Sequence, residues 1–473
     1  MRHFRLPDRD QNYLLMNVNL DSVAPVGSAL RSIDSLVDML DTASIEKTYD
    51  MKTAQGNTPI HPKTLIKIAL WAMHNCRFSL RKMEEDTVNN LGYKWLTGGA
   101  IIDHSTLGKF LASNPIDLAA LLTQVVQIGV EENLMDFELL GVDTVKIRAN
   151  ASYKQFRDEE GIRKEKEKIK ARIEEILKKA TKEQAVLEEE ELKALALRQT
   201  RLDTAKRKLA AREKERKAEG LRINITDNDC QMVQQGNGEV NPGYPVTVAV
   251  DSKSDFITGI KMDEYGNDAR NLFPTIEESE GNSGKRHEET VADPGFGSIE
   301  NLERLEAEGR KALIPDRRME AEKRGETAKG EYDRSKFKYM GRTDRYRCPE
   351  GKMLENGGKL EQNGRTYYRY FNREACLGCS CVGECTKSQY RIISRDEKEG
   401  LKEQMRKKVE DQMETYKKRA HMAESPFGQM KHNLKYRIFM RRGLEKVKME
   451  MSLLCMLHNM LKIAQFQFGY MTG

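Results

Sequence analysis

The pattern of hydrophobic and polar positions divides the chain into a helical part and a part that contains strands. From His61-Pro62, apolar residues recur at three- and four-residue steps, a spacing typical of helices. Further helices are predicted to start at Ser79, near Asp103 and after Pro115. These short helices predict a helical N-terminal domain, either of helix-turn-helix type or a plain bundle. Residues 1–55 are a polar, mixed lead-in for which no element is predicted.

A strand pattern begins at Phe137. In FELLGVDTVKIRAN an apolar run is followed by Val145 and Ile147, which alternate with Lys146 and Arg148. The other strand-like segments lie at residues 247–252, 256–262, 289–293 and 311–316, and a helical pattern covers 299–307. Strands mixed with helices predict an α/β domain with a mixed sheet.

Residues 157–219 interrupt the predicted sheet. They contain 20 Lys and Arg and 16 Asp and Glu, so 36 of 63 residues are charged. Ile162, Ile169, Ile173 and Ile176 form one apolar stripe, and three leucines repeat at sevens from Leu195. This pattern predicts an inserted antiparallel helical hairpin or short coiled coil. We expect its charges to form a solvated surface, with direct contact to DNA as the alternative.

Composition excludes several classes of protein. No stretch approaches 18 uninterrupted apolar residues, so a membrane protein is not expected, and the N-terminus lacks a secretory signal. Eight cysteines in 473 residues are too few for a disulfide scaffold, which favours reduced thiols or a metal in the cytoplasm. The net charge of +6 is a small excess, but residues 395–448 hold 16 basic and 9 acidic residues, an excess of +7. The basic charge is therefore concentrated near the C-terminus.

Two aspartates follow apolar strand residues. Asp143 lies within the first predicted strand, and Asp293 ends another before a Pro-Gly-Phe-Gly turn. A carboxylate among apolar neighbours is costly unless it is paired, protonated or bound to a cation, although an exposed strand end is also possible. If the two strands are adjacent, the pair would suit Mg²⁺ or Mn²⁺ and two-metal phosphoryl transfer. A third acid, Glu424, lies among Arg419, Lys431 and Arg437.

Several segments together resemble the DDE-type transposases of bacterial insertion sequences. HPKTLIKIALWAMHNCRFSLRKMEE and WLTGGAIIDHSTLGKF are similar to the N-terminal domain of that family. GVDTVKIRANAS and VADPGFGSIENL are similar to its first two catalytic strands. YKKRAHMAESPFGQMKHN and RRGLEKVKMEMSLLCMLHNMLKI are similar to its C-terminal signature. The order and joint presence of these segments make the resemblance specific.

The resemblance implies an RNase H-like catalytic core in which Asp143, Asp293 and Glu424 hold Mg²⁺ (or Mn²⁺). Glu450 is the competing third acid. The residues expected to contact DNA are Tyr416, Arg419, Lys431, Arg437, Arg441 and Arg442. The expected organisation is a helical DNA-binding domain (1–133), the first core strand (134–155), the helical hairpin (156–220), the continued core (221–334), a Cys-rich insert (335–392) and a basic C-terminal helical part (393–473).

The cysteines between the second and third acids have spacings that suit zinc. Cys348, Cys376, Cys379 and Cys385 are the best four ligands for a tetrahedral site, with Cys381 as a possible replacement. Reduced thiols in a loop-rich insert are the alternative.

The function implied is metal-dependent cleavage at insertion-sequence ends, followed by 3′-hydroxyl strand transfer into target DNA. The alternatives are a non-catalytic DNA-binding or regulatory protein derived from a transposase, and a metal-dependent nuclease that stops at hydrolysis. The expected partner is double-stranded DNA bound by a homodimer, because two ends must be paired. The expected location is the cytoplasm, in association with the nucleoid.

Overall fold

The computed structural model describes residues 12–13, 18–49, 58–179, 185–235, 238–262, 268–316, 319, 330–362 and 364–469. Its contacts divide the chain into two units, which are residues 1–287 with 420–473, and residues 288–419. Among the helices in these described ranges, none is long and apolar enough to cross a membrane.

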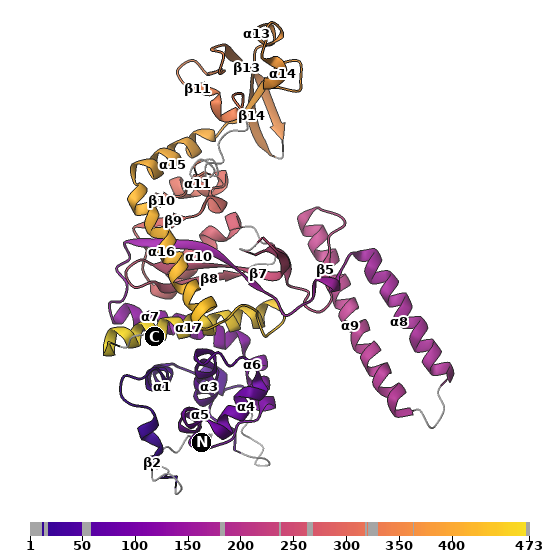
Figure 1. The fold of residues 1–473 in the computed structure, drawn as a ribbon, viewed down its shortest axis with the longest axis vertical. Coiled ribbons are helices and arrows are strands. Elements are labelled where there is room, and N and C mark those ends of the chain that lie inside the picture. Colours follow the sequence, from indigo (N-terminus) through magenta and orange to yellow (C-terminus); the bar gives the residue numbers. More distant parts are fainter. Residues whose placement is uncertain are drawn as a thin grey trace. The chain divides into compact units, whose positions relative to one another are not determined.

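The first unit begins with a group of helices (Figure 1). Pro62 occupies the first turn of its helix, and the Asp103 side chain accepts a hydrogen bond from the Thr106 backbone N–H at the start of another, so both predicted helix starts are confirmed. The helices are α1 (Ala29–Met39), α2 (Ala43–Glu46), α3 (Pro62–His74), α4 (Leu80–Asn89), α5 (Leu91–Thr97), α6 (His104–Ser113) and α7 (Pro115–Glu131).

Helix α1 corrects the expectation that residues 1–55 form only a polar lead-in. Leu30, Ile33 and Val37 are buried on one face of this helix, while polar residues separate them in the sequence. Ser28 caps the helix by accepting a hydrogen bond from the Arg31 backbone N–H at 3.3 Å. The buried face packs against α3 and the C-terminal helix α17 (Leu444–Phe468). The N-terminal region therefore contributes to the core of this unit.

A four-stranded antiparallel arrangement forms the centre of the first unit. Strand β7 (Val240–Asp251) pairs with β3 (Leu139–Arg148) on one side, and with β6 (Gln231–Gln234) and then β8 (Phe256–Met262) on the other. Helix α10 (Asp268–Ser283) packs on β7 and β8, and α17 packs on β8. Gly259 is required there, because a Cβ atom would lie 2.9 Å from the Ser279 backbone nitrogen of α10. This close packing fixes the sheet that carries Asp143.

The charged insertion is a helical hairpin, as predicted. Helices α8 (Glu159–Lys179) and α9 (Ala185–Arg216) run side by side (Figure 1). Ile162, Ile169, Leu202 and Leu209 are buried between them, whereas most ion pairs on the outside are exposed and contribute little. Short strands β4 (Phe156–Arg157) and β5 (Ile223–Asn224) pair at the root. The apolar stripe, rather than the charges, therefore holds the hairpin together.

The Leu202→Ala substitution tests that conclusion. Leu202 is 0% exposed, so removing its side chain is expected to lower the free energy of hairpin opening by about 2–4 kcal/mol. Hydrogen exchange of the α8 and α9 amides measures this opening. The control is Leu197→Ala on the same helix, where the side chain is 54% exposed, and it should change the value by about 0.5 kcal/mol or less. Equal effects of the two substitutions would contradict the assignment of the stripe as the core.

The second unit holds two sheets. Strands β9 (Glu289–Ala292) and β10 (Lys311–Leu313) pair in parallel, with α11 (Ile299–Ala307) between them in sequence. An antiparallel sheet follows in the Cys-rich insert, and α15 and α16 come after it. These elements are β11 (Lys338–Met340), β12 (Arg345–Arg347), β13 (Met353–Gln362), β14 (Arg365–Phe371), α13 (Arg373–Leu377), α14 (Val382–Cys385), β15 (Ile392–Asp396), α15 (Glu399–Asp411) and α16 (Met413–Gly428). The predicted class, a mixed α/β core with a helical N-terminal region, a helical hairpin and a Cys-rich insert, is confirmed.

Candidate active site

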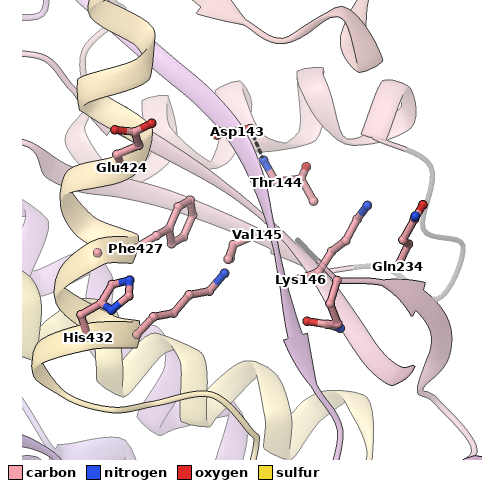
Figure 2. Close-up of a pocket in the computed structure, with 11 residues that line it drawn as sticks. Asp143, Thr144, Val145, Lys146, Gln234, Glu424, Phe427 and His432 are labelled. Atoms are coloured by element: carbon pink, nitrogen blue, oxygen red, sulfur yellow. Dashed lines mark hydrogen bonds between the residues drawn. The ribbon is translucent and has the colours of Figure 1, made fainter. Parts of the chain in front are cut away.

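Asp143 of β3 and Glu424 of α16 line the same pocket, although 281 positions separate them in sequence (Figure 2). The pocket has a volume of about 620 Å³. Lys431 and His432 line it from the segment that follows α16, and Gln234 lines it from β6. The structure therefore brings together two of the three predicted acids and one of the predicted cations.

Asp143 is held at the centre of the strand ladder. It lies opposite Val248 of β7, and its Oδ1 atom accepts a hydrogen bond from the Thr144 backbone N–H at 2.8 Å. The Thr144 hydroxyl oxygen lies 2.9 Å from that of Thr247 across the ladder. Because the backbone of a paired strand moves little, these contacts fix the direction of the Asp143 carboxylate. The Asp143 side chain is half-buried, so it is partly shielded from water but still lines the pocket.

Glu424 lies near the C-terminal end of α16, where the helix geometry changes. Pro426 interrupts the hydrogen-bond ladder of α16, and a π-helical turn follows at Gln429–Asn433. Its wide turn is marked by the Leu434 N–H, which donates to the Gln429 carbonyl at 2.9 Å. The exposed Glu424 and the half-buried Lys431 lie on either side of this change and both line the pocket.

Lys431 is the predicted DNA contact that lines this pocket, and its ammonium group can bind a phosphate oxygen. Burial lowers the pKa of its ammonium group, and the negative charge of Asp143 partly offsets that effect. Two carboxylates, Asp143 and Glu424, and two ammonium groups, Lys146 and Lys431, thus line a common space. Such a set can bind a divalent cation through the carboxylates and a phosphate oxygen through a lysine.

A buried network anchors the segment that carries Glu424 and Lys431. The Ser425 hydroxyl donates to Asp255 Oδ2 at 2.7 Å, and His458 of α17 contacts both the Gln429 side chain and, at 2.8 Å, the Asp255 carbonyl. A carbonyl can only accept, so His458 Nε2 donates to the Asp255 carbonyl, and Nδ1 lies against Gln429 Oε1. The network links α17, the β7–β8 turn and the π-helical turn.

Burial lowers the pKa of His458 to about 4, and this predicts a pH-dependent stability. His458 is neutral in the folded chain but takes up a proton below about pH 6.5 when the chain unfolds, so its contribution to stability falls as the pH drops from 6.5 towards 4. Between pH 7 and pH 5 the loss is about 2 kcal/mol. Urea denaturation at both pH values should show that His458→Gln removes this part of the pH dependence. The same substitution at His432, which is exposed, should leave it unchanged.

Asp293 belongs to the second unit. It ends β9 and caps the short helical turn Pro294–Phe296, with its Oδ1 atom accepting a hydrogen bond from the Gly295 N–H at 2.7 Å. Ser298 caps α11 in the same way, through the Asn301 N–H. The turn therefore holds the Asp293 carboxylate at the carboxyl end of a buried parallel strand.

Glu450, the competing third acid, has a different environment. It is buried, and its carboxylate accepts hydrogen bonds from the Met440 and Arg441 backbone N–H groups at 3.0 and 2.9 Å. Burial raises its pKa, and the neighbouring Tyr436 hydroxyl partly offsets the shift. These contacts shape the loop before α17, and Glu450 does not line the pocket that the described residues form.

The other residues predicted to contact DNA lie on either side of the pocket residues in sequence. Tyr416 and Arg419 are on α16 in the second unit, where the Arg419 guanidinium lies 5.7 Å from the centre of the Tyr416 ring. Arg441 donates its backbone N–H to Glu450, and Arg442 donates to the Asn150 carbonyl at 2.8 Å. Arg437 accepts a hydrogen bond from the Arg148 N–H through its carbonyl. Of all the predicted DNA contacts, only Lys431 lines the described pocket.

Sequence reasoning missed several pocket residues. Gln234 and Gln235 come from β6 and the loop after it, Phe427 comes from the end of α16, and His432 lies in the π-helical turn. Polar residues on a short strand carry no pattern that indicates a site. Only the pairing of β6 with β7 brings Gln234 towards β3.

The cysteines of the insert gather around a small cavity. Its volume is about 30 Å³, and thiols of different segments line it. Burial raises the pKa of Cys385, as do the neighbouring thiols of Cys376 and Cys348, while Arg391 opposes the shift. The full set of cysteines lining the cavity is Cys348, Cys376, Cys379, Cys381 and Cys385. Among the described residues, however, no cluster of three or more His, Cys, Asp or Glu side chains has the geometry of a metal site.

Two family models match the chain. The family described as "Transposase DDE domain" matches residues 347–464, which include Glu424, Lys431 and the five clustered cysteines. The family described as "Transposase domain (DUF772)" matches residues 18–113, which include helices α1 to α6. No curated protein and no solved structure matches the chain. The two matches are typical of insertion-sequence transposases, and they confirm the resemblance found in the sequence.

Proposed function

We propose that this chain, which matches two transposase domain families, cuts DNA at the ends of an insertion sequence and joins the freed 3′-hydroxyl to target DNA. The observation that carries the proposal is the shared pocket of Asp143, Glu424 and Lys431. Phosphoryl transfer on DNA needs groups that stabilise charge on a phosphate, and carboxylates with a metal and a lysine can supply them.

Asp143, Asp293 and Glu424 are the proposed ligands of Mg²⁺ or Mn²⁺. The chemistry of these residues suits this group, because all three offer carboxylate oxygens, which hard divalent cations prefer. Asp143 and Glu424 line one pocket, although the described residues form no preformed cluster of three ligands. When bound, the metal would lower the pKa of an attacking water and stabilise the charge that develops on the phosphate.

The protein groups around the pocket have separate roles in this proposal. The Thr144 N–H fixes the Asp143 carboxylate, and the Asp255–His458 network fixes the segment that carries Glu424. The Lys431 ammonium group pairs with a phosphate oxygen and positions the DNA backbone. We propose Glu424 rather than Glu450 as the third acid, because the Glu450 carboxylate is already satisfied by backbone N–H groups.

The Cys-rich insert is proposed to bind one zinc ion. Cys348, Cys376, Cys379 and Cys385 surround a cavity close in size to a single water molecule, and thiolates are the preferred ligands of structural zinc. The Cys379 N–H also donates to the Cys376 carbonyl at 3.1 Å, a tight turn that brings these two thiols to one side. Zinc would cross-link the sheet β11–β15 to the short helices α13 and α14.

The proposed partner is double-stranded DNA, bound by a homodimer that pairs two ends. Arg437, Arg441 and Arg442, together with Tyr416 and Arg419, are the proposed contacts to the backbone beyond the pocket. Binding by such contacts weakens steeply with salt, because neutralised phosphates release counterions. A chromosomal DNA substrate also implies a cytoplasmic, nucleoid-associated location.

Cleavage and strand transfer on the DNA that flanks the gene test this function. We expect Mg²⁺-dependent nicking at terminal inverted repeats and joining of the 3′ ends to a second DNA. Cleavage without joining would instead identify a nuclease. Specific binding without cleavage, in Mg²⁺ and in Mn²⁺, would identify a regulatory protein.

A further inference from the structure

A second cavity opens at the root of the helical hairpin. It has a volume of about 470 Å³ and lies where β4, β5 and the end of α9 meet β6. Phe156 and Met232 provide apolar walls, and Tyr153 stands at the edge with 57% of its surface exposed. The cavity thus combines an apolar interior with an aromatic ring that solvent can reach.

Three arginines line this cavity, and no carboxylate does among its described lining residues. Arg212 is buried, and its guanidinium lies 3.7 Å from Asp229 Oδ1, which also pairs with Lys208. Arg222 donates to the Phe156 carbonyl at 3.1 Å, which holds its guanidinium near the apolar wall. Arg216 and Arg222 are exposed.

Strand β6 connects this cavity directly to the candidate active site. Gln231 and Met232, at the start of the strand, line the root cavity, whereas Gln234, at its end, lines the pocket of Asp143. Three residue steps of a strand span about 10 Å. That distance corresponds to about three base-pair steps along the axis of B-form DNA. A DNA strand that passes Asp143 can therefore reach the root cavity.

We propose that the root cavity binds a DNA strand next to the active site, with an unstacked base against Tyr153 and the adjacent phosphates on Arg216 and Arg222. Aromatic rings beside a cationic groove are the usual means of binding single-stranded nucleic acid. A duplex backbone would need only the charges of the arginines. The apolar cavity beside them therefore favours binding of an unstacked base. The inference rests on the proposed function for its choice of DNA as the partner.

Binding of a 15-residue oligodeoxythymidine to the full chain without divalent metal tests the proposal. Fluorescence anisotropy at several salt concentrations gives both the affinity and its salt dependence. Arg216→Ala/Arg222→Ala is expected to weaken binding at least tenfold. It should also lower the slope of log affinity against log salt by about 1.4, since each contact with a single strand contributes about 0.7.

Tyr153 has a different expected signature. Tyr153→Ala should weaken binding about tenfold while the salt slope stays the same, because stacking releases no counterions. Tyr153→Phe keeps the ring and should bind as the unchanged chain does. A 15-base-pair duplex should be much less sensitive to Tyr153→Ala than the oligonucleotide.

The matched control is Arg172→Ala/Lys193→Ala, which removes two exposed cations from the hairpin away from the root. It should leave oligonucleotide binding within about twofold. An equal loss in this control, or unchanged binding in the Arg216→Ala/Arg222→Ala chain, would overturn the proposal, and so would binding of an acidic peptide in preference to DNA. Circular dichroism confirms that each variant is folded. Repeating the binding with Asp143→Asn separates this site from catalysis, since a chain that never cuts DNA can still bind the oligonucleotide.

Discussion

Asp143→Asn is expected to reduce Mg²⁺-dependent cleavage of insertion-sequence ends by about 1,000-fold or more. The substitution keeps the shape of the side chain and can keep the hydrogen bond from the Thr144 N–H, but it removes the charge that would bind the metal. A metal that contributes several kcal/mol to transition-state stabilisation accounts for a loss of this size, because each 1.36 kcal/mol is a factor of ten. Single-turnover cleavage of a labelled end measures the rate.

Glu424→Gln should give a loss of the same order. The matched control is Glu414→Gln on the same helix, where the side chain is 87% exposed and pairs with Lys417, and it should cleave at the normal rate. Glu450→Gln should instead lower stability, because it weakens a buried contact to two backbone N–H groups. A folded Glu450→Gln chain without activity, together with an active Glu424→Gln chain, would reverse the assignment of the third acid. Full activity of Asp143→Asn would refute the site itself.

Removal of zinc is expected to open the Cys-rich sheet. The sheet has a small buried core, and Cys348, Cys376 and Cys385 pack against it. The core residues are Phe337, Tyr346, Leu354, Tyr370 and Ile393. A core of this size provides little stability by itself, whereas structural zinc contributes several kcal/mol in small domains. Chelation, or Cys376→Ser, should therefore speed hydrogen exchange in β13 and β14 at least a hundredfold.

Metal analysis of protein purified under reducing conditions provides the direct measurement. We expect one zinc per chain, none in Cys376→Ser, and one in Cys76→Ser, whose cysteine lies in the turn after α3 and outside the cysteine cluster. Loss of zinc in Cys381→Ser but not in Cys385→Ser would show that Cys381, rather than Cys385, is the fourth ligand. A full complement of reduced thiols without zinc would refute the site.

Local patterns predicted the elements that are buried on one face. The strand Phe256–Met262 and the helix Ile299–Ala307 were predicted at their observed bounds, because apolar residues recur there with a clear period. The strand Met353–Gln362 was not predicted, since most of its residues are polar and exposed and only pairing with β12 and β14 makes it a strand. Helix α1 was not predicted, although Leu30, Ile33 and Val37 recur at the three- and four-residue steps of an amphipathic helix.

The candidate active site was also predicted only in part. The apolar neighbours of Asp143 suggested that this carboxylate has a function, and the cations around Glu424 did the same for that residue. Their common pocket depends on how α16 and the π-helical turn pack, which no local pattern contains. Only the resemblance to transposases predicted that Asp143 and Glu424 belong to the same site. It could not supply Gln234, which reaches the pocket through a strand of only four residues.

The root of the helical hairpin has a consequence for evolution. Phe156 pairs with Asn224 and Arg157 with Ile223, so the two ends of a 65-residue insertion lie next to each other. Such a closed junction allows the inserted segment to lengthen, shorten or be exchanged while the register of β3 with β7 is preserved. Natural selection can therefore change the hairpin as an exchangeable module, with the strand that carries Asp143 left intact.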